Sequence, residues 1–256
     1  MRQKSKYKNK KSTESFGFMI YGLNGVTEIL KTKRFSIHSI HLQKDSKAII
    51  EKRIQSSIKL HQGKVQVLDK ETFLKKYKGL RTQGVVVHFD GKVVQNVPSF
   101  KNAKGNICIL IADNIEDPQN LGQIMRTAEC AGIEGIAIPE HHSAGITNTV
   151  LQVSQGAFIH LPIFKVVNIR NLMKQLKDDG FWIVGLENSI SAKQWHQIDY
   201  SGKIAIVVGS EGKGIRKAVL KDCDFLATIP MKGKINSLNV SASVSAILFE
   251  RQRQVK

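Results

Sequence analysis

Near its end the chain reads Ile229-Pro-Met-Lys-Gly-Lys-Ile-Asn-Ser-Leu-Asn-Val-Ser-Ala-Ser243. We interpret this stretch as a strand that ends at Pro-Met, a short loop, and a helix that opens across Ser237, Leu238 and Asn239 and ends near Glu250. The first backbone N–H groups of a helix have no intrahelical partner, so a helix start can bind a polar or anionic ligand. Ser and Asn are also common helix caps, and this stretch alone leaves capping and ligand binding equally open.

A second apolar run ends in a glycine-rich loop, with the sequence Ile204-Ala-Ile-Val-Val-Gly-Ser-Glu-Gly-Lys-Gly-Ile215. The run fits a strand buried on both faces, and the glycines after it allow the backbone to approach a ligand closely. The spacing after Gly209 matches neither the Walker phosphate loop nor the dinucleotide pattern of three spaced glycines. A nucleotide phosphate site is therefore disfavoured, whereas an adenosine-type ligand remains open.

A third segment repeats the order of strand, polar turn and helix: Ile107-Cys-Ile-Leu-Ile-Ala-Asp-Asn-Ile-Glu-Asp-Pro-Gln-Asn-Leu-Gly-Gln-Ile-Met-Arg-Thr-Ala-Glu-Cys-Ala-Gly132. Apolar residues at helical spacing predict the core-facing side of its helix. They are Leu121, Ile124, Met125 and Ala128. Arg126 lies off this stripe and fits either an ordinary solvated residue or a guanidinium that binds a phosphate or ribose oxygen.

Three strand ends, each followed by a helix, predict an open α/β sheet, in which ligands bind outside the carboxyl ends of the strands. Together the three segments closely resemble the three sequence motifs of the SpoU/TrmH family of RNA ribose 2′-O-methyltransferases, part of the SPOUT superfamily. The first motif is Asn120-Leu-Gly-Gln-Ile-Met-Arg126-Thr-Ala, and the second is Val208-Gly-Ser-Glu211-Gly-Lys-Gly. The third is Ile229-Pro-Met with Ser237-Leu-Asn239-Val-Ser. The motifs occur in the family's order, and the resemblance covers roughly residues 106–252.

The order of elements predicts a mostly parallel sheet with helices on both faces. From residue 107 we expect strands at 107–112, 135–138, 159–163, 181–186, 204–209 and 225–229, and helices at 120–131, 148–156, 168–178, 214–221 and from 237 onward. Before residue 96 we expect helices at 25–31, 48–60 and 71–77, and strands at 36–42, 65–68 and 85–89. The family resemblance further implies a deep trefoil knot and a homodimer whose active site is completed across the interface.

The stretch Tyr21-Gly-Leu-Asn-Gly-Val-Thr-Glu-Ile-Leu resembles the start of the substrate-binding domain of many family members, which is similar in fold to ribosomal protein L30e. Asn24 stands where that pattern usually has His. We therefore expect four parts: a basic disordered tail at 1–15, an L30e-like RNA-binding domain at 16–95, a linker at 96–105, and a SpoU methyltransferase domain with the S-adenosylmethionine (AdoMet) site at 106–256.

Positive charge is concentrated in the first part of the chain. Of the net charge of +18, residues 1–104 hold 23 Lys and Arg against 7 Asp and Glu (+16), and the remainder holds 16 against 14 (+2). This asymmetry predicts a polyanionic partner, most simply RNA, with binding that weakens steeply with salt. An anionic membrane surface could attract the same charge, but no amphipathic stretch supports it, and no apolar run is long enough to cross a membrane. We expect a cytoplasmic protein, an organellar matrix being also compatible.

The resemblance implies methyl transfer from AdoMet to a ribose 2′-hydroxyl, and we expect the ribose of a guanosine in 23S-type ribosomal RNA. Motif matching implies catalytic roles for Arg126, Asn120, Glu211 and Asn239. It implies cofactor contacts for Gly209, Ile229, Met231, Ser237 and Leu238. Arg126 would either deprotonate the hydroxyl or orient it, and a free guanidinium is a poor base because it keeps its proton above about pH 12. We expect no metal, since neither the three cysteines nor the eight histidines are spaced like ligands.

Three alternatives remain. The substrate could be transfer RNA instead of ribosomal RNA. The chain could also be a non-catalytic RNA-binding or ribosome-assembly factor of the same fold, although none of the three motifs is broken. A methyltransferase with an ordinary Rossmann core would need a glycine-rich loop directly after its first strand. The segment 113–120, Asp-Asn-Ile-Glu-Asp-Pro-Gln-Asn, contains no glycine.

Overall fold

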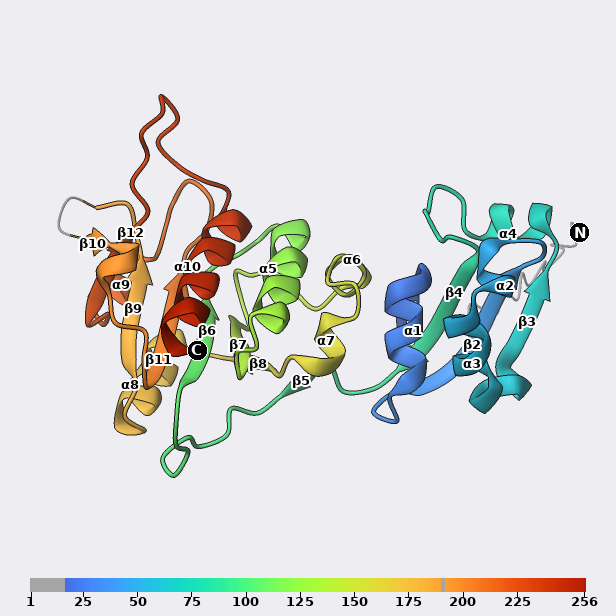
Figure 1. The fold of residues 1–256 in the computed structure, drawn as a ribbon, viewed down its shortest axis with the longest axis horizontal. Helices are drawn as coiled ribbons and strands as arrows, with labels where there is room; N and C mark the ends of the chain where they lie inside the picture. Colours follow the sequence, from blue (N-terminus) through green and yellow to red (C-terminus); the bar gives the residue numbers. More distant parts are fainter. Residues whose placement is uncertain (1–16, 190–191) are drawn as a thin grey trace, which may run out of the picture.

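The computed structural model describes residues 17–189 and 192–256, which form two sheets (Figure 1). The basic tail expected at 1–15 lies outside the described residues. The smaller sheet has the order β1 (Phe18–Tyr21), β4 (Val85–Asp90), β2 (Ser36–Gln43), β3 (Val65–Leu68). Its helices are α1 (Leu23–Lys31), α2 (Lys47–Ile50), α3 (Lys52–Ile58) and α4 (Lys70–Lys76), with a 3-10 turn at Lys59–Lys64.

The larger sheet has eight strands, and all its strand pairs are parallel. Its order is β10 (Lys193–Gln194), β12 (Phe225–Thr228), β9 (Trp182–Leu186), β11 (Lys203–Val208), β6 (Ile107–Ala112), β7 (Gly135–Pro139), β8 (Ile163–Val166), β5 (Val94–Gln95). Its helices are α5 (Pro118–Cys130), α6 (Asn148–Val153), α7 (Ala157–His160), α8 (Ile169–Asp178), α9 (Lys217–Leu220) and α10 (Val240–Val255), with a 3-10 turn at Trp195–Gln197.

The central strands are apolar throughout because both faces of the sheet are covered. Along β6, Cys108 and Leu110 face the core shared with α5 and α10, whereas Ile107 and Ile109 face a second core under α8. Side chains alternate between the two faces of a strand, so a strand buried on both sides needs apolar residues at every position. The predicted parallel sheet with helices on both faces is confirmed.

Three predicted helices have clearly different limits. The helix expected at 48–60 is divided at Glu51, whose backbone is extended and whose carboxylate accepts a hydrogen bond from the backbone N–H of Arg53. The helix expected at 214–221 is reduced to α9, because Gly214 is left-handed and Arg216 is extended. The final helix begins at Val240 and not across 237–239, and it continues past Glu250 to Val255.

The prediction for residues 148–163 was wrong. The expected helix 148–156 ends at Val153, and the segment expected to be a strand at 159–163 begins with the helix α7, followed by β8. Gln155 and Gly156 have left-handed backbones (φ 52° and 96°), which break the helix and redirect the chain. A short apolar run such as 157–164 fits a buried helix or a strand equally well, so its periodicity could not separate the two.

Three short strands were not anticipated: β1, β5 and β10. The two-residue strand β5 pairs with β8 of the larger sheet, and Phe100 packs into the core under α8. The chain between the two sheets is therefore integrated into the larger one at these points.

A buried polar cluster in the smaller sheet predicts acid sensitivity. Tyr77 on the α4 side hydrogen-bonds to His41 and to His88 of the sheet. Burial, with the nearby charge of Lys76, lowers the pKa of His41 to about 4 and also lowers the pKa of His88. Between pH 4 and the ordinary histidine pKa the unfolded chain binds more protons than the folded one, so stability must fall as the pH is lowered through this window.

We expect the thermal midpoint to drop between pH 7 and pH 5, and a His41→Asn variant to show a flatter dependence. Circular dichroism melts of both proteins at several pH values provide the test. Equal slopes for the two proteins would exclude His41 as the source of the acid sensitivity.

Candidate active site

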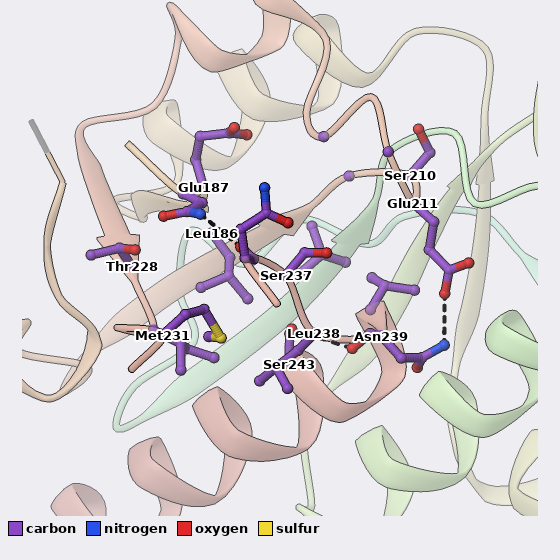
Figure 2. A pocket seen from close by; sticks show the side chains of 18 residues that line it. Leu186, Glu187, Ser210, Glu211, Thr228, Met231, Ser237, Leu238, Asn239 and Ser243 are labelled. Atoms are coloured by element: carbon purple, nitrogen blue, oxygen red, sulfur yellow. Dashed lines mark hydrogen bonds between the residues drawn. The ribbon is translucent and has the colours of Figure 1, made fainter. Parts of the chain in front are cut away.

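A pocket lies where three parallel strands end. It has a volume of about 680 Å³ and is enclosed by the carboxyl ends of β9, β11 and β12 and by the start of α10 (Figure 2). The five positions predicted for cofactor contact all line it: Gly209, Ile229, Met231, Ser237 and Leu238. Of the predicted catalytic residues, Glu211 and Asn239 line it as well.

The glycine-rich loop after β11 can form only with glycine at position 209. Ser210 and Gly214 form an antiparallel bridge, with Gly214 N donating to Ser210 O at 2.9 Å. A Cβ atom on Gly209 would overlap the backbone of Gly214 and Ile215. The loop therefore folds back directly against the end of β11 and forms one wall of the pocket with its backbone.

Glu211, Asn120 and Asn239 form a hydrogen-bonded triangle from three distant segments. Glu211 Oε1 accepts from Asn120 Nδ2 at 2.8 Å and from Asn239 Nδ2 at 2.6 Å. Asn239 Nδ2 also donates to Asn120 Oδ1 at 2.9 Å. Both amides present donors to one carboxylate oxygen, which suits the ionised form of Glu211. The three motifs thus meet at one point beside the pocket.

Asn239 also caps α10, so the capping role that the sequence left open is confirmed, and ligand binding at this helix start stays a prediction. Its Oδ1 accepts from the backbone N–H of Ser241 at 2.9 Å. The amide oxygen of Asn239 thus accepts a hydrogen bond from the helix start, and its amide nitrogen donates one to Glu211. Replacing it would be expected to loosen the helix start and the triangle together.

Arg126 does not reach this triangle within one chain. It lies on the exposed side of α5, six residues after Asn120, which corresponds to roughly 9 Å along the helix axis. No hydrogen bond joins Arg126 to another residue of the described chain, and it does not line the 680 Å³ pocket. The predicted catalytic set therefore divides into an assembled group of three and a separate exposed guanidinium.

A smaller cavity of about 210 Å³ shares Ser210, Glu211 and Val240 with the main pocket. Asn120 lines it on the α5 side, and the exposed Lys213 contributes a cation. Glu211 thus stands between two cavities, which fits a site that holds two molecules side by side.

An ion pair that the sequence reading missed joins the end of β6 to the glycine-rich loop. Asp113 is fully buried and accepts from the backbone N–H of Arg216 at 2.9 Å and from its Nε at 2.8 Å. The two residues are 103 positions apart. The available signal was a carboxylate directly after an apolar strand, because buried carboxylates are rare unless paired. Glu187 and Asn188, at the end of β9, also line the pocket and were not anticipated.

Within 17–189 and 192–256, no group of three or more His, Cys, Asp and Glu side chains could hold a metal ion. No helix in the same ranges is long and apolar enough to cross a membrane.

Residues 107–249, more than half of the chain, match the SpoU rRNA Methylase family. The chain belongs to this family. A Staphylococcus saprophyticus protein assigned to the TrmH family of tRNA/rRNA methyltransferases is 44% identical over 142 residues, which cover 56% of this chain and 57% of the relative. The matched region therefore spans less than two thirds of that relative's length.

Solved structures of the family share the fold. An AdoMet-bound rRNA methyltransferase from Sinorhizobium meliloti superposes with a TM-score of 0.75 at 22% identity, covering 93% of this chain and 88% of that one. The A. aeolicus TrmH/SpoU tRNA modifying enzyme superposes with a TM-score of 0.54 at 30% identity, covering 61% of this chain and 79% of that one. The fold is the knotted α/β fold of the SPOUT methyltransferases, as predicted.

Proposed function

We propose that this protein transfers a methyl group from AdoMet to a ribose 2′-hydroxyl of RNA. The observation that carries the proposal is the meeting of the three motif segments at one pocket, closed on one side by the Asn120–Glu211–Asn239 triangle. Membership of the SpoU family supports the same reaction class. AdoMet would supply the electrophilic methyl group, and the protein's own residues would bind and orient the two reactants.

The pocket suits a ligand of this kind. Its volume of about 680 Å³ is in the range of cofactor sites, and both apolar and polar residues line it. Val208, Ile229 and Leu238 can enclose an adenine ring, while nearby backbone N–H and C=O groups satisfy its edge. We assign adenosine binding to the backbone near Gly209, Ile229 and Leu238, with Met231 and Ser237 completing the wall.

We assign Arg126 to the acceptor RNA. A guanidinium is a poor base, so its proposed role is to orient the 2′-hydroxyl and the neighbouring phosphate through its fixed donors. Alignment of two reactants can lower the barrier by up to about 7–11 kcal/mol. Asn120, Glu211 and Asn239 would shape the wall between cofactor and ribose.

We further propose a homodimer that completes the active site. Support comes from the exposed position of Arg126 on α5, which leaves it unused within one chain. Helices α5 and α10 pack together through a hydrogen bond between Thr127 and Ser245, and Phe249 on α10 is 46% exposed. A second copy placed on this pair of helices would bring an additional surface to Arg126 and to the RNA.

The favoured substrate is a guanosine of 23S-type ribosomal RNA, and transfer RNA is the alternative. The matched rRNA methyltransferase covers 93% of this chain, including the smaller sheet, whereas the tRNA-modifying enzyme covers 61%. Because the relatives are bacterial, we place the enzyme in the cytoplasm.

The test is transfer of tritiated methyl groups from AdoMet to purified large-subunit rRNA and, separately, to bulk tRNA, with ribose methylation mapped in each product. Label at one rRNA ribose is the expected result. Label in tRNA alone would overturn the substrate assignment, and AdoMet binding without transfer to either RNA would favour the assembly-factor alternative.

Basic residues on α4 and the loop after it form a candidate RNA surface, which we call the basic surface. It comprises the exposed residues Lys70, Lys75, Lys76, Lys78 and Arg81. We expect a Lys75→Gln/Lys78→Gln/Arg81→Gln variant to bind RNA more weakly and to lower the slope of log Kd against log salt by up to about 2–3, because each lost phosphate contact removes about 0.7–0.9.

The matched control replaces three exposed lysines of the larger domain, Lys174, Lys217 and Lys221, by glutamine. Filter binding at several salt concentrations measures both proteins. If the control lowered the slope as much as the variant, RNA binding would not be localised to the basic surface.

A further inference from the structure

The free edge of β1 is occupied by side chains of α6. Among the strands that the structure describes, β1 pairs with β4 alone, so its other edge would leave backbone groups without strand partners. Met19 N donates to Asn148 Oδ1 and Tyr21 N donates to Gln152 Oε1, each at 2.9 Å. Gln152 Nε2 returns a hydrogen bond to Tyr21 O, also at 2.9 Å. We call these four residues the edge clamp.

The spacing of the edge clamp explains its fit. Asn148 and Gln152 are one helical turn apart, about 6 Å along the axis, and Met19 and Tyr21 are alternate residues of a strand, about 7 Å apart. Two amide side chains of a helix can therefore replace a neighbouring strand at two successive free positions. The contact joins residues about 130 positions apart in the sequence, from strand β1 of the smaller sheet and from helix α6.

Arg34 and three aromatic rings extend the same junction. The Arg34 guanidinium donates to Ile159 O at 3.2 Å and to Val93 O at 2.9 Å, and its partial burial lowers its pKa. Phe158 of α7 lies 5.7 Å from Phe35 and 5.9 Å from Phe89 of the smaller sheet, measured between ring centroids. These rings belong to one hydrophobic cluster that runs through both parts of the molecule.

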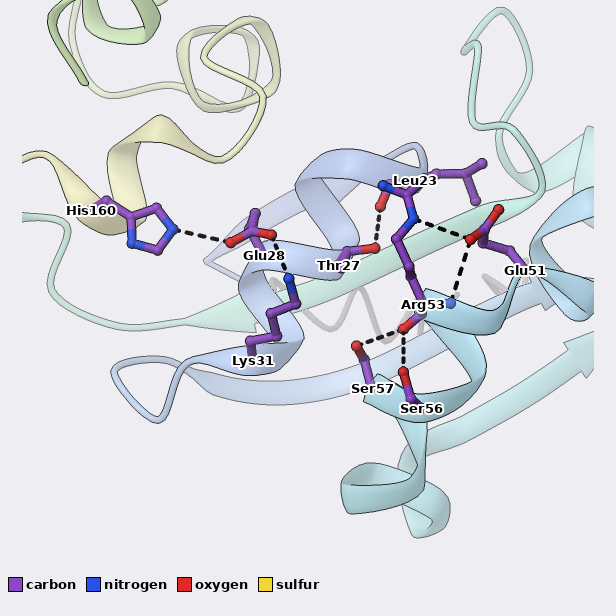
Figure 3. A network of polar contacts seen from close by, with 9 residues as sticks. All are labelled: Leu23, Thr27, Glu28, Lys31, Glu51, Arg53, Ser56, Ser57 and His160. Carbon is purple, nitrogen blue, oxygen red and sulfur yellow. Dashed lines mark hydrogen bonds and ion pairs between the residues drawn. The ribbon is translucent and has the colours of Figure 1, made fainter. Parts of the chain in front are cut away.

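Helix α1 rests on the turn between α6 and α7 (Figure 3). Gly156 in this turn has φ 96°, and a Cβ atom there would come within 3.1 Å of Glu28 Cβ. Glu28 forms ion pairs with Lys31 at 2.8 Å and with His160 of α7 at 3.1 Å. The interface therefore combines a continuous apolar core, close backbone approach and a paired strand edge. Domains joined in this way do not rotate freely relative to each other.

This junction connects the basic surface to the candidate active site. In Figure 1 the loop after α4 and the loop 229–239 at the pocket both extend from the upper edge of the molecule. RNA bound at the loop after α4 could therefore extend toward the loop 229–239 at the pocket. No residue of the edge clamp belongs to either surface, so the edge clamp can affect the geometry of bound RNA without contributing contacts to it.

We propose that the edge clamp holds the basic surface at a fixed offset from the active site, and thereby selects which ribose of the bound RNA is methylated. This inference rests on the proposed function. Asn148 and Gln152 are positioning residues: they set the register of the RNA over the pocket, and they leave RNA affinity and AdoMet binding to other parts of the protein.

The test is an Asn148→Ala/Gln152→Ala variant, examined in two ways. Hydrogen exchange at the backbone amides of Met19 and Tyr21 should accelerate at least about tenfold, because their acceptors are removed. Methylation mapping should show at least about a tenfold loss of rate at the wild-type nucleotide, with label appearing at neighbouring riboses, since small misplacements of a reactant cost up to about a hundredfold. RNA and AdoMet affinities should stay within about twofold of wild type, as expected for residues that touch neither ligand.

Two variants serve as controls. Asn148→Asp keeps the acceptor for Met19 N and should retain slow exchange at Met19 and single-site methylation. Thr149→Ala alters an exposed neighbour on the same helix and should behave as wild type.

Two results would overturn the inference. One is fast exchange at Met19 and Tyr21 with unchanged rate and site of methylation; the other is slow exchange that persists in the double variant. A wild-type protein that transfers no methyl group would overturn the proposed function and ribose selection with it. The exchange comparison would then still decide whether the edge clamp holds the two sheets together.

Discussion

Replacing Arg126 by alanine is expected to reduce methyl transfer to below about 1% of the wild-type rate, the scale of loss when a reacting group is no longer held in position. AdoMet affinity should stay within about twofold, because Arg126 does not line the pocket and would contribute mainly in the transition state. Because Arg126 is exposed and its side chain makes no described hydrogen bond, the variant is expected to fold as the wild type does. Single-turnover transfer assays with AdoMet titrations measure both quantities.

Cys130→Ala is the matched control for Arg126, because Cys130 is exposed one turn further along α5. It should transfer methyl groups at the wild-type rate. Activity above a few per cent in Arg126→Ala would show that the assigned role is wrong. Equal losses in both variants would instead point to a general disturbance of α5.

The second large effect is expected at Gly209. A Cβ atom at this position would overlap the backbone of Gly214 and Ile215, so Gly209→Ala must displace the loop that forms one wall of the pocket. We expect AdoMet affinity to fall at least about a hundredfold, the scale of binding loss when the geometry of a preformed site is disturbed. Isothermal titration with AdoMet measures the affinity, and a thermal melt confirms that the variant is folded.

Gly233→Ala is the control, because a Cβ atom there would make only an ordinary contact, 4.0 Å from the backbone N of Ile235, and the backbone of Gly233 is not left-handed. It lies in the loop after β12 and should bind AdoMet as the wild type does. An unchanged AdoMet affinity in Gly209→Ala would remove the glycine-rich loop from the cofactor site.

The residues that meet at the pocket could be predicted because each follows an apolar strand. Such a strand can be recognised from a short stretch of sequence, without knowledge of distant contacts. Gly209, Ile229 and the helix start near Asn239 each come directly after such a strand or its loop, and parallel strands place these ends at one edge of the sheet. Family resemblance added Asn120, Glu211 and Asn239 as catalytic residues, and the structure joins the three by hydrogen bonds. The roles of these residues remain predictions.

Other features depend on contacts that no local pattern contains. The pairing of Asp113 with Arg216 and the edge clamp join residues more than 100 positions apart. The two-residue strands β5 and β10 are too short for a periodic signal. The left-handed backbone at Gln155 interrupts a helix whose apolar spacing is continuous in the sequence, at a turn where Gly156 lies close to Glu28 of α1. Propensity is overridden by tertiary structure at such places.

The central claim is that the pocket between β11, β12 and α10 holds AdoMet for transfer to a ribose 2′-hydroxyl. The most direct measurement is mass spectrometry of the nucleosides from large-subunit rRNA incubated with the protein and deuterated-methyl AdoMet. The account predicts labelled 2′-O-methylguanosine with the wild-type protein and none with Arg126→Ala. Label on a nucleobase, or equal label with both proteins, would contradict it.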